Sequence, residues 1–195
     1  MAEEAAEPRP AIVDGPGPTL WTIGHSIRPF GAFVDLLQEH DIALLADIRT
    51  IPRSRHNPQY GIDVLRVTLP AAGITYRHLA GLGGLRHATG ETTNAGWRNL
   101  SFRGFADYMQ TVEFGTALGE LVDLARDANV VIMCAEAVPW RCHRSLVADA
   151  LVLRGLDVHH IMGPGESPAA RLTPFAQVEG LVITYPEQSR PPSVS

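Results

Sequence analysis

The chain has 195 residues, of which 45% are hydrophobic and 19% are charged. These values fit one globular domain and exclude a disordered or fibrous protein. All 16 basic residues are arginines, because the sequence contains no lysine, and 21 acidic residues bring the formal net charge to −5. This acidic balance argues against a protein that coats nucleic acid broadly, but it is compatible with a focused anion site.

The two ends of the chain differ in composition from its middle. Residues 1–19 are rich in Ala, Glu, Pro and Gly, and residues 186–195 contain mostly Pro and Ser, so we expect disordered tails around a single domain at residues 20–185. The acidic N-terminus lacks the apolar core of a secretory signal, and no apolar run approaches the ~20 residues that cross a bilayer. We therefore expect a cytoplasmic protein that does not enter membranes.

Apolar spacing within the domain predicts strands and helices in alternation. Pro70 should end one helix and Gly155 should follow another. The expected strands are 20–24, 43–48, 74–79, 130–134 and 158–162, and the expected helices are 29–40, 61–72, 105–109, 114–128 and 141–154. This order predicts an α/β fold, a three-layer α/β/α sandwich with a mainly parallel sheet of about five strands. The long loop at 80–101 has no periodicity, which is more typical of a functional segment than of a simple connector.

Polar side chains follow four of the expected strands. Because ligands bind beyond the carboxyl ends of strands in open parallel sheets, we expect these side chains to meet in one cleft. In chain order they are His25 and Ser26, Asp47 and Arg49, Arg77 and His78, and Cys134 and Glu136.

The segment from Met133 to Ser145 has the highest density of reactive side chains. It reads as a strand, a tight loop and a helix start, where unpaired N–H groups favour an anion that Arg141 or Arg144 could clamp. In such a field Cys134 would have a lowered pKa and act as a nucleophile. Phosphatase and rhodanese loops place five residues between Cys and Arg, whereas six separate Cys134 from Arg141, so a phosphocysteine mechanism is disfavoured.

A metal site is a second interpretation of these residues. Zinc or iron could be bound by Cys134, Cys142, His143 and His25, although the spacing of the two cysteines and the histidine is not a standard ligand pattern. The sequence requires no cofactor. Cys142, and also Cys134, could instead be small buried hydrophobic residues, and two cysteines are too few for a disulfide scaffold.

Several other residues each allow two interpretations, one structural and one functional. Asp47 beside Arg49 can form a structural ion pair, or it can provide an orienting acid next to an anion clamp. Arg55 lies on a Pro-containing loop and can contact an anion or solvent. Arg86 follows Gly81-Leu82-Gly83-Gly84, which could wrap an anion or form a plain turn. Trp97, among nearby arginines, could stack on bases, although its aromatic neighbours at helical spacing fit a core.

Five ordered motifs resemble those of one known family, the domain of unknown function 488 (DUF488). The motifs are Thr22-Ile23-Gly24-His25-Ser26, Asp47-Ile48-Arg49 with Pro52, Ser54 and Arg55, Leu82-Gly83-Gly84 with Arg86, Phe105-Ala106-Asp107-Tyr108-Met109, and Cys134-Ala135-Glu136 with Cys142-His143-Arg144. The resemblance spans about residues 20–163. Tyr60 stands where the family pattern suggests Phe.

The resemblance implies a fold and a set of motif positions without an established reaction, and members often have the general label of a DNA repair protein. Its motif residues coincide with those placed at the strand ends. The sequence therefore predicts a small enzyme that acts on an anionic substrate, bearing phosphate or carboxylate and possibly a nucleotide or nucleic-acid end.

In this hypothesis Cys134 is the nucleophile or a metal ligand, His25 or Glu136 moves protons, and Asp47 assists them. Ser26 and the arginines would bind the substrate; these arginines are Arg49, Arg55, Arg86, Arg141 and Arg144. A non-catalytic nucleic-acid-binding or DNA-repair accessory protein is the alternative. A third reading takes the polar cluster as an internal ion-pair network.

Overall fold

The computed structural model of the chain describes residues 17–88, 90 and 92–188. The two expected tails lie outside the described residues, apart from residues 17–19 and 186–188. The first strand begins at Thr19, one residue inside the expected tail. In the described part of the chain, no helix has the length and apolar character that a membrane crossing requires.

The centre of the molecule is a five-stranded sheet in which all paired strands are parallel. Its strands are β1 (Thr19–Gly24), β2 (Leu44–Asp47), β3 (Thr75–His78), β4 (Val130–Cys134) and β5 (Asp157–Ile161). They lie in the order β3-β2-β4-β1-β5. The apolar runs of β2 and β4 are buried throughout, as strands covered on both faces should be. The parallel sheet expected from the sequence is confirmed.

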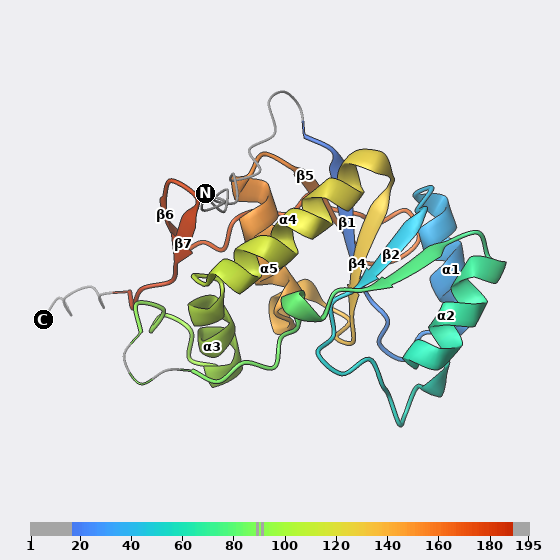
Figure 1. Cartoon of the computed structure of the whole chain (residues 1–195), viewed down its shortest axis with the longest axis horizontal. Helices are drawn as coiled ribbons and strands as arrows, with labels where there is room; N and C mark the ends of the chain where they lie inside the picture. Colours follow the sequence, from blue (N-terminus) through green and yellow to red (C-terminus); the bar gives the residue numbers. More distant parts are fainter. Residues whose placement is uncertain (1–16, 89, 91, 189–195) are drawn as a thin grey trace, which may run out of the picture.

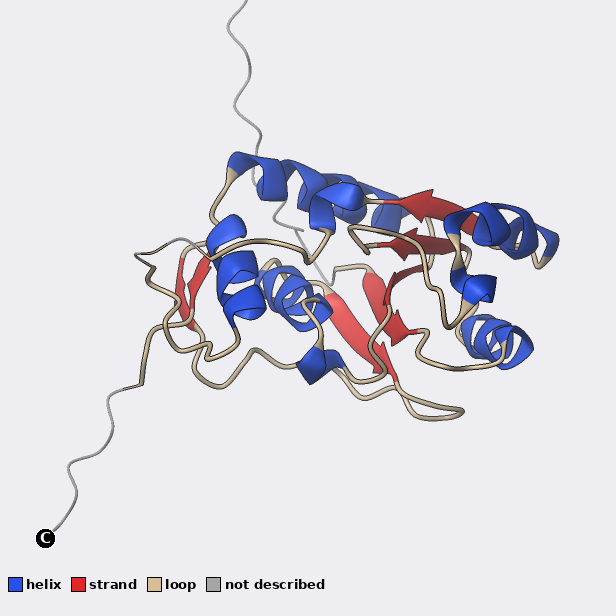
Figure 2. Cartoon of the chain, turned by 90° about the horizontal axis from the view of Figure 1, so that it is seen from below, coloured by secondary structure: helices blue, strands red, loops and turns tan. Residues whose placement is uncertain are grey.

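Helices cover both faces of this sheet and complete the three layers (Figures 1 and 2). One face packs against α1 (Phe30–Glu39) and α2 (Ile62–Ala71) in a core that includes Phe33 and Leu65. The opposite core packs the sheet against α3 (Leu100–Tyr108), α4 (Val112–Asp127) and α5 (Arg144–Leu153). The three-layer α/β/α fold is thus confirmed.

Three differences from the sequence-based elements have local causes. Helix α3 begins at Leu100, within the expected loop, because the Asn99 side chain accepts a hydrogen bond from the Ser101 N–H and caps it. Helix α5 begins at Arg144 rather than at residue 141, because the extended backbone of Cys142 separates it from the short helix η3 (Pro139–Arg141).

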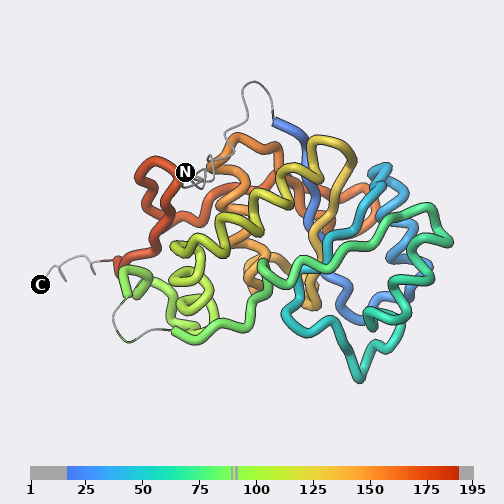
Figure 3. Tube along the Cα trace, viewed as in Figure 1, coloured from blue at the N-terminus to red at the C-terminus, as the bar shows by residue number. Residues whose placement is uncertain are grey.

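The third difference is a small antiparallel hairpin near the C-terminus, formed by β6 (Gln177–Glu179) and β7 (Val182–Thr184). Strands of three residues leave no detectable alternation in the sequence. The segment after β7 returns to the α3 side of the molecule (Figure 3), where Tyr185 accepts a hydrogen bond from the Gly96 N–H at 2.8 Å. The described chain after β5 is therefore part of the packed domain as far as Tyr185, which is buried.

The connections of the sheet define where a ligand crevice is expected. Strand β4 lies between β1 and β2. The chain leaves β1 and β2 toward the helices of one face, α1 and α2, and leaves β4 toward α5 on the other face. Connections that diverge in this way open a crevice at the carboxyl ends of the strands, so the edge of β1, β4 and β2 is the place to examine for a site.

Candidate functional site

Strand register brings the expected polar residues to one edge. Gly24 pairs with Cys134, and Asp47 pairs with both Met133 and His78, so these four strands end at the same level. The ladder continues into the loops, where the His25 N–H donates to the Cys134 carbonyl at 3.0 Å. The parallel sheet thus gathers side chains from four separate sequence motifs.

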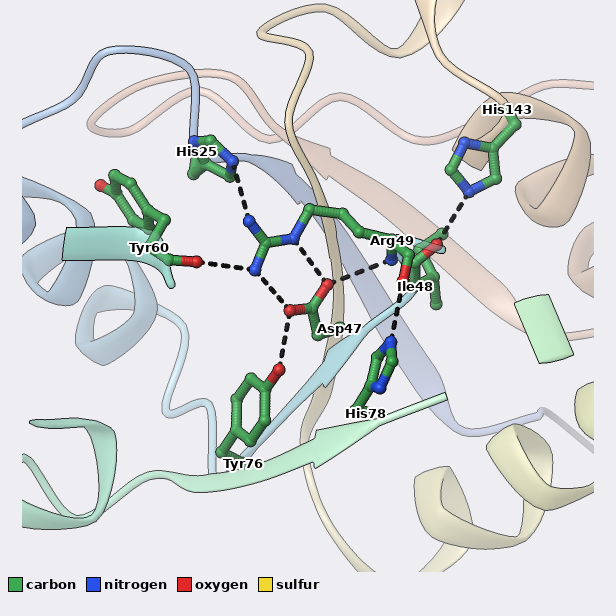
Figure 4. Close-up of polar contacts among 8 residues, drawn as sticks. All are labelled: His25, Asp47, Ile48, Arg49, Tyr60, Tyr76, His78 and His143. Carbon is green, nitrogen blue, oxygen red and sulfur yellow. Dashed lines mark hydrogen bonds and ion pairs between the residues drawn. The ribbon is translucent and has the colours of Figure 1, made fainter. Parts of the chain in front are cut away.

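Asp47 and Arg49 form a bidentate ion pair at the end of β2 (Figure 4). Arg49 Nε donates to Asp47 Oδ1 at 2.8 Å and Nη2 donates to Oδ2 at 2.5 Å. The pair is buried, with Asp47 at 0% and Arg49 at 7% exposure. Tyr76 Oη also donates to Asp47 Oδ2, at 2.8 Å. Of the two readings of these residues, the structure contains the ion pair.

His25 lies beside this pair and stacks on the Tyr60 ring, with the ring centroids 4.3 Å apart. Its Nδ1 is 2.9 Å from the Ser26 carbonyl, an acceptor, so Nδ1 is the protonated nitrogen. The unprotonated Nε2 then accepts from Arg49 Nη1 at 3.3 Å. Burial, helped by the charge of Arg49, lowers the pKa of His25, so this imidazole is neutral at pH 7.

Arg144 is the first residue of α5 and is fully buried, at 0% exposure. Its Nη1 contacts the Glu136 carbonyl and lies 2.8 Å from Cys134 Sγ, while Nη2 donates to the Ala137 carbonyl at 2.8 Å. Arg144 Nε is also buried and has no hydrogen-bond partner among the described residues. Burial, with a smaller effect of Arg28, lowers the pKa of Arg144 to about 10, which leaves it charged at pH 7.

The loop that surrounds Arg144 requires Gly24 in the neighbouring strand. A Cβ atom at residue 24 would lie 1.7 Å from the Glu136 carbonyl oxygen and 2.9 Å from Arg144 Nη1. Only glycine has room there. The carbonyl oxygens of the β4–α5 loop therefore face the Arg144 guanidinium. The sequence had instead suggested that N–H groups of this loop would face an anion.

The two cysteines lie at the two ends of this loop, Cys134 as the last residue of β4 and Cys142 directly after η3. Their Sγ atoms are in direct contact and the structure pairs them as a disulfide, with 7.5 Å between the Cα atoms. His143 follows Cys142, and its Nδ1 is 3.6 Å from Cys142 Sγ. His143 Nε2 donates to the Ile48 carbonyl at 3.1 Å, so Nδ1 is left as an acceptor. Burial lowers the pKa of His143 to about 4.

The residues that meet at this edge form a closed network. Cys134 is 1% exposed, Cys142 5% and His25 2%. The sequence predicted an open cleft lined by these side chains, whereas in this conformation they fill the space between the strand ends. Access to Cys134 requires movement of the β4–α5 loop, whose Ala135 and Glu136 are exposed.

The other expected site residues are distributed around the network. The Glu136 side chain is exposed on the loop, and its carbonyl rather than its carboxylate contacts Arg144. Arg55 and Arg141 are exposed on the loops after β2 and β4. Ser26 is partly buried and has a φ of 48°, a left-handed conformation that is strained for serine.

Arg86 has local partners instead of a place at the strand ends. It donates to the Gly83 carbonyl at 3.1 Å and lies 3.6 Å above the Tyr108 ring. Trp97, the candidate base-stacking residue, packs against three aromatic side chains, those of Phe102, Phe175 and Tyr185.

The expected metal ligands do not converge in this arrangement. His25 Nε2 faces the Arg49 guanidinium, and His143 Nε2 is bonded to a carbonyl. Within the described residues, no group of three His, Cys, Asp or Glu side chains is placed to hold a metal ion. The donor set therefore does not fit zinc or iron as it stands.

Sequence reasoning missed three residues that complete the network. Tyr76 donates to Asp47, the Tyr60 carbonyl accepts from Arg49 at 2.8 Å, and Arg28 donates to the Gly24 carbonyl at 2.9 Å. Tyr76 lies inside a strand, where a tyrosine normally indicates packing alone. The Tyr60 contact is made by its backbone carbonyl, which any residue provides, so no side-chain pattern could have indicated it.

The fold and this network define an α/β protein with a buried cysteine, histidine and arginine site at the strand ends. The family model described as "Domain of unknown function DUF488" matches residues 29–151. The chain belongs to the DUF488 family. Comparison with curated proteins finds no match, and neither does comparison with solved structures.

Proposed function

We propose that the protein is a small cytoplasmic enzyme that uses Cys134 as a thiolate on an anionic substrate. The observation that carries this proposal is the 2.8 Å contact between Arg144 Nη1 and Cys134 Sγ. A buried guanidinium needs a counter-charge, and within the described residues no carboxylate forms an ion pair with Arg144. Once the disulfide with Cys142 is reduced, a Cys134 thiolate in contact with Nη1 supplies that charge, together with the more distant Glu136 carboxylate.

The same pairing makes Cys134 a nucleophile. An adjacent cation favours the thiolate over the thiol, and the thiolate is the form that attacks electrophiles. Neutral His25 hydrogen-bonds Arg49, so we assign His25 to the ordering of the strand ends as well as to proton transfer. Asp47 acts with it, because it fixes the orientation of Arg49.

Substrate binding is assigned to the exposed side of the same edge. Arg55 and Arg141 are exposed on the loops after two neighbouring strands, where guanidinium groups can bind phosphate or carboxylate. A cavity of about 540 Å³ adjoins the β4–α5 loop and is lined by Pro139, Trp140 and Arg171, among others. Its volume is in the range of small-molecule sites, and its tryptophan fits a flat ring such as a nucleobase.

The proposal is tested by titrating the thiols of the reduced protein. Thiolate absorbance in the ultraviolet needs no access of a reagent, so the burial of Cys134 does not affect the measurement. We expect the wild-type protein to contain a thiolate at neutral pH that is lost in Cys134→Ser and retained in Cys142→Ser. A Cys134 that titrates at the ordinary value of about 8.5 would remove the basis of the proposal.

The anion is tested separately with inorganic phosphate and calorimetry. Binding that weakens in Arg141→Ala, with no change in Arg126→Ala on the exposed surface of α4, supports the assigned edge. If phosphate does not bind, or if both variants bind it equally, the anion-binding part of the proposal is wrong.

A further inference from the structure

The two cysteines are in an arrangement that the proposed anionic-substrate reaction does not use. That reaction needs one thiolate, yet a second sulfur, that of Cys142, lies in direct contact with Cys134 Sγ. Eight positions separate the two cysteines in the chain. Their approach is therefore produced by the return of the β4–α5 loop over Gly24.

The two sulfurs have different polar surroundings. Cys134 Sγ accepts from the buried Arg144 guanidinium, which stabilises the Cys134 thiolate once the disulfide is reduced. Cys142 Sγ instead lies 3.6 Å from His143 Nδ1, the unprotonated nitrogen of a neutral imidazole. Disulfide formation by an oxidant needs one thiolate that attacks the oxidant and one thiol that attacks the resulting sulfenic acid. The guanidinium beside Cys134 and the ring nitrogen that orients the Cys142 thiol fit these two roles.

From this asymmetry we propose that Cys134 and Cys142 form a dithiol–disulfide redox centre that reduces hydroperoxides, with Cys134 as the attacking residue and Cys142 as the resolving residue. The inference rests on the same Cys134 thiolate as the proposed function. Burial selects the oxidant, because a small uncharged hydroperoxide can reach a sulfur that is 1% exposed more readily than a bulky disulfide can.

The reaction has two steps. The Cys134 thiolate attacks one peroxide oxygen, the O–O bond breaks, and the departing alkoxide takes a proton from water, which leaves Cys134 as a sulfenic acid. Cys142, whose thiol contacts His143 Nδ1 at 3.6 Å, then attacks the Cys134 sulfur. The S–O bond breaks and the departing hydroxide takes the Cys142 thiol proton as water. Two thiols and one hydroperoxide thus give one disulfide, one alcohol and one water, and a dithiol reductant restores the thiols.

Gly84 explains how His143 is held for this role. A Cβ atom at residue 84 would lie 2.3 Å from His143 Nδ1, so the backbone of the glycine loop packs directly against the imidazole. Phe105 contacts the ring from another side, with the centroids 5.0 Å apart. Together with the hydrogen bond to Ile48, these contacts fix the ring while Nδ1 faces Cys142.

The experiment treats the fully reduced protein with hydrogen peroxide and follows both cysteines by mass spectrometry. We expect the wild-type chain to form the intramolecular disulfide and dithiothreitol to reverse it. Cys142→Ser should stop at a sulfenic acid on Cys134, which dimedone traps. Cys134→Ser should form sulfenic acid on Cys142 about tenfold more slowly, because Cys142 Sγ faces a neutral imidazole instead of a guanidinium that stabilises a thiolate.

A further variant separates the roles of the neighbouring groups. His143→Gln keeps a donor for the Ile48 carbonyl but lacks the ring nitrogen that orients the Cys142 thiol, so it should slow disulfide closure without slowing sulfenic acid formation. Equal oxidation of the two cysteines, or no disulfide in a protein whose Cys134 titrates as a thiolate, would overturn the redox centre alone. If titration shows no Cys134 thiolate at neutral pH, both proposals are wrong. If the protein reacts with peroxide as described but does not bind phosphate, only the proposed anionic substrate is wrong.

Discussion

At the scale of single residues, the buried charges at the strand ends determine how the site responds to substitution. Asp47 is fully buried and provides both oxygens to Arg49. Removing one member of a buried ion pair leaves the other charge without compensation, which typically costs about 3–5 kcal/mol.

We therefore predict that Asp47→Asn lowers the free energy of unfolding by about 3–5 kcal/mol, measured by urea denaturation. Asp35→Asn is the matched control, because Asp35 is exposed on α1 and should tolerate the change. Equal stability of the two variants would show that the Asp47–Arg49 pair contributes little to the fold.

The pH dependence of stability follows from His143. Its pKa is about 4 in the folded protein, against 6.5 as the ordinary value. Between these values the unfolded chain binds a proton that the folded chain does not, so stability falls as the pH falls from 6.5 toward 4, with no effect above this range.

His143→Gln cannot titrate and should reduce the loss of stability between pH 7 and pH 5 by about 2 kcal/mol. Urea denaturation at the two pH values measures this difference. His56→Gln changes an exposed histidine and should retain the wild-type dependence. A His143→Gln protein with an unchanged pH dependence would contradict a neutral, buried His143.

The sequence allowed us to predict which residues lie together at the strand ends. The rule that parallel strands end at one edge was enough to select Cys134, His25, Asp47 and Arg49. The partner of Arg144 could not be predicted, because arginine is normally a surface residue, and here three contacts within one loop hold it inside. Side-chain direction depends on the path of that loop, which no local pattern encodes.

At the scale of elements, the site depends on how closely the β4–α5 loop approaches β1. Apolar runs located β2 and β4, which are buried throughout, and the regular alternation of strands and helices along the chain located the edge strands β3 and β5. It missed β6 and β7, which have three residues each and are mostly exposed. The start of α5 was misplaced because the sequence does not reveal the extended Cys142 that interrupts the two helical segments.

Two glycine substitutions test the close approach of this loop. Gly24→Ala should displace the Glu136 carbonyl and lower the urea midpoint markedly, since its Cβ would lie 1.7 Å from that oxygen. Gly119→Ala lies within α4, where the added Cβ meets nothing within 4 Å, and should raise the free energy of unfolding by about 0.5–1 kcal/mol. A Gly24→Ala protein as stable as the wild type would mean that the loop does not lie against β1.

At the scale of the whole molecule, the distribution of charge favours an enzyme that binds small anions over a protein that binds long nucleic acids. The chain has a net charge of −5. Exposed arginines nevertheless follow two neighbouring strands, Arg53 and Arg55 after β2 and Arg141 after β4. A positive edge on an acidic body attracts small anions locally, while the body repels a long polyanion.

We predict that the protein binds inorganic phosphate but has no measurable affinity for long duplex DNA at physiological salt. Combining Arg55→Ala with Arg141→Ala should weaken phosphate binding by up to about fivefold per arginine, as expected for solvent-exposed ion pairs worth about 1 kcal/mol at most. Arg126→Ala, which removes a partner of Asp123 on α4, should have no effect. Fluorescence anisotropy with labelled duplex, measured over a salt series, provides the comparison. Tight duplex binding that falls steeply with salt would instead support the nucleic-acid-binding alternative, because release of counterions from the phosphate backbone produces that dependence.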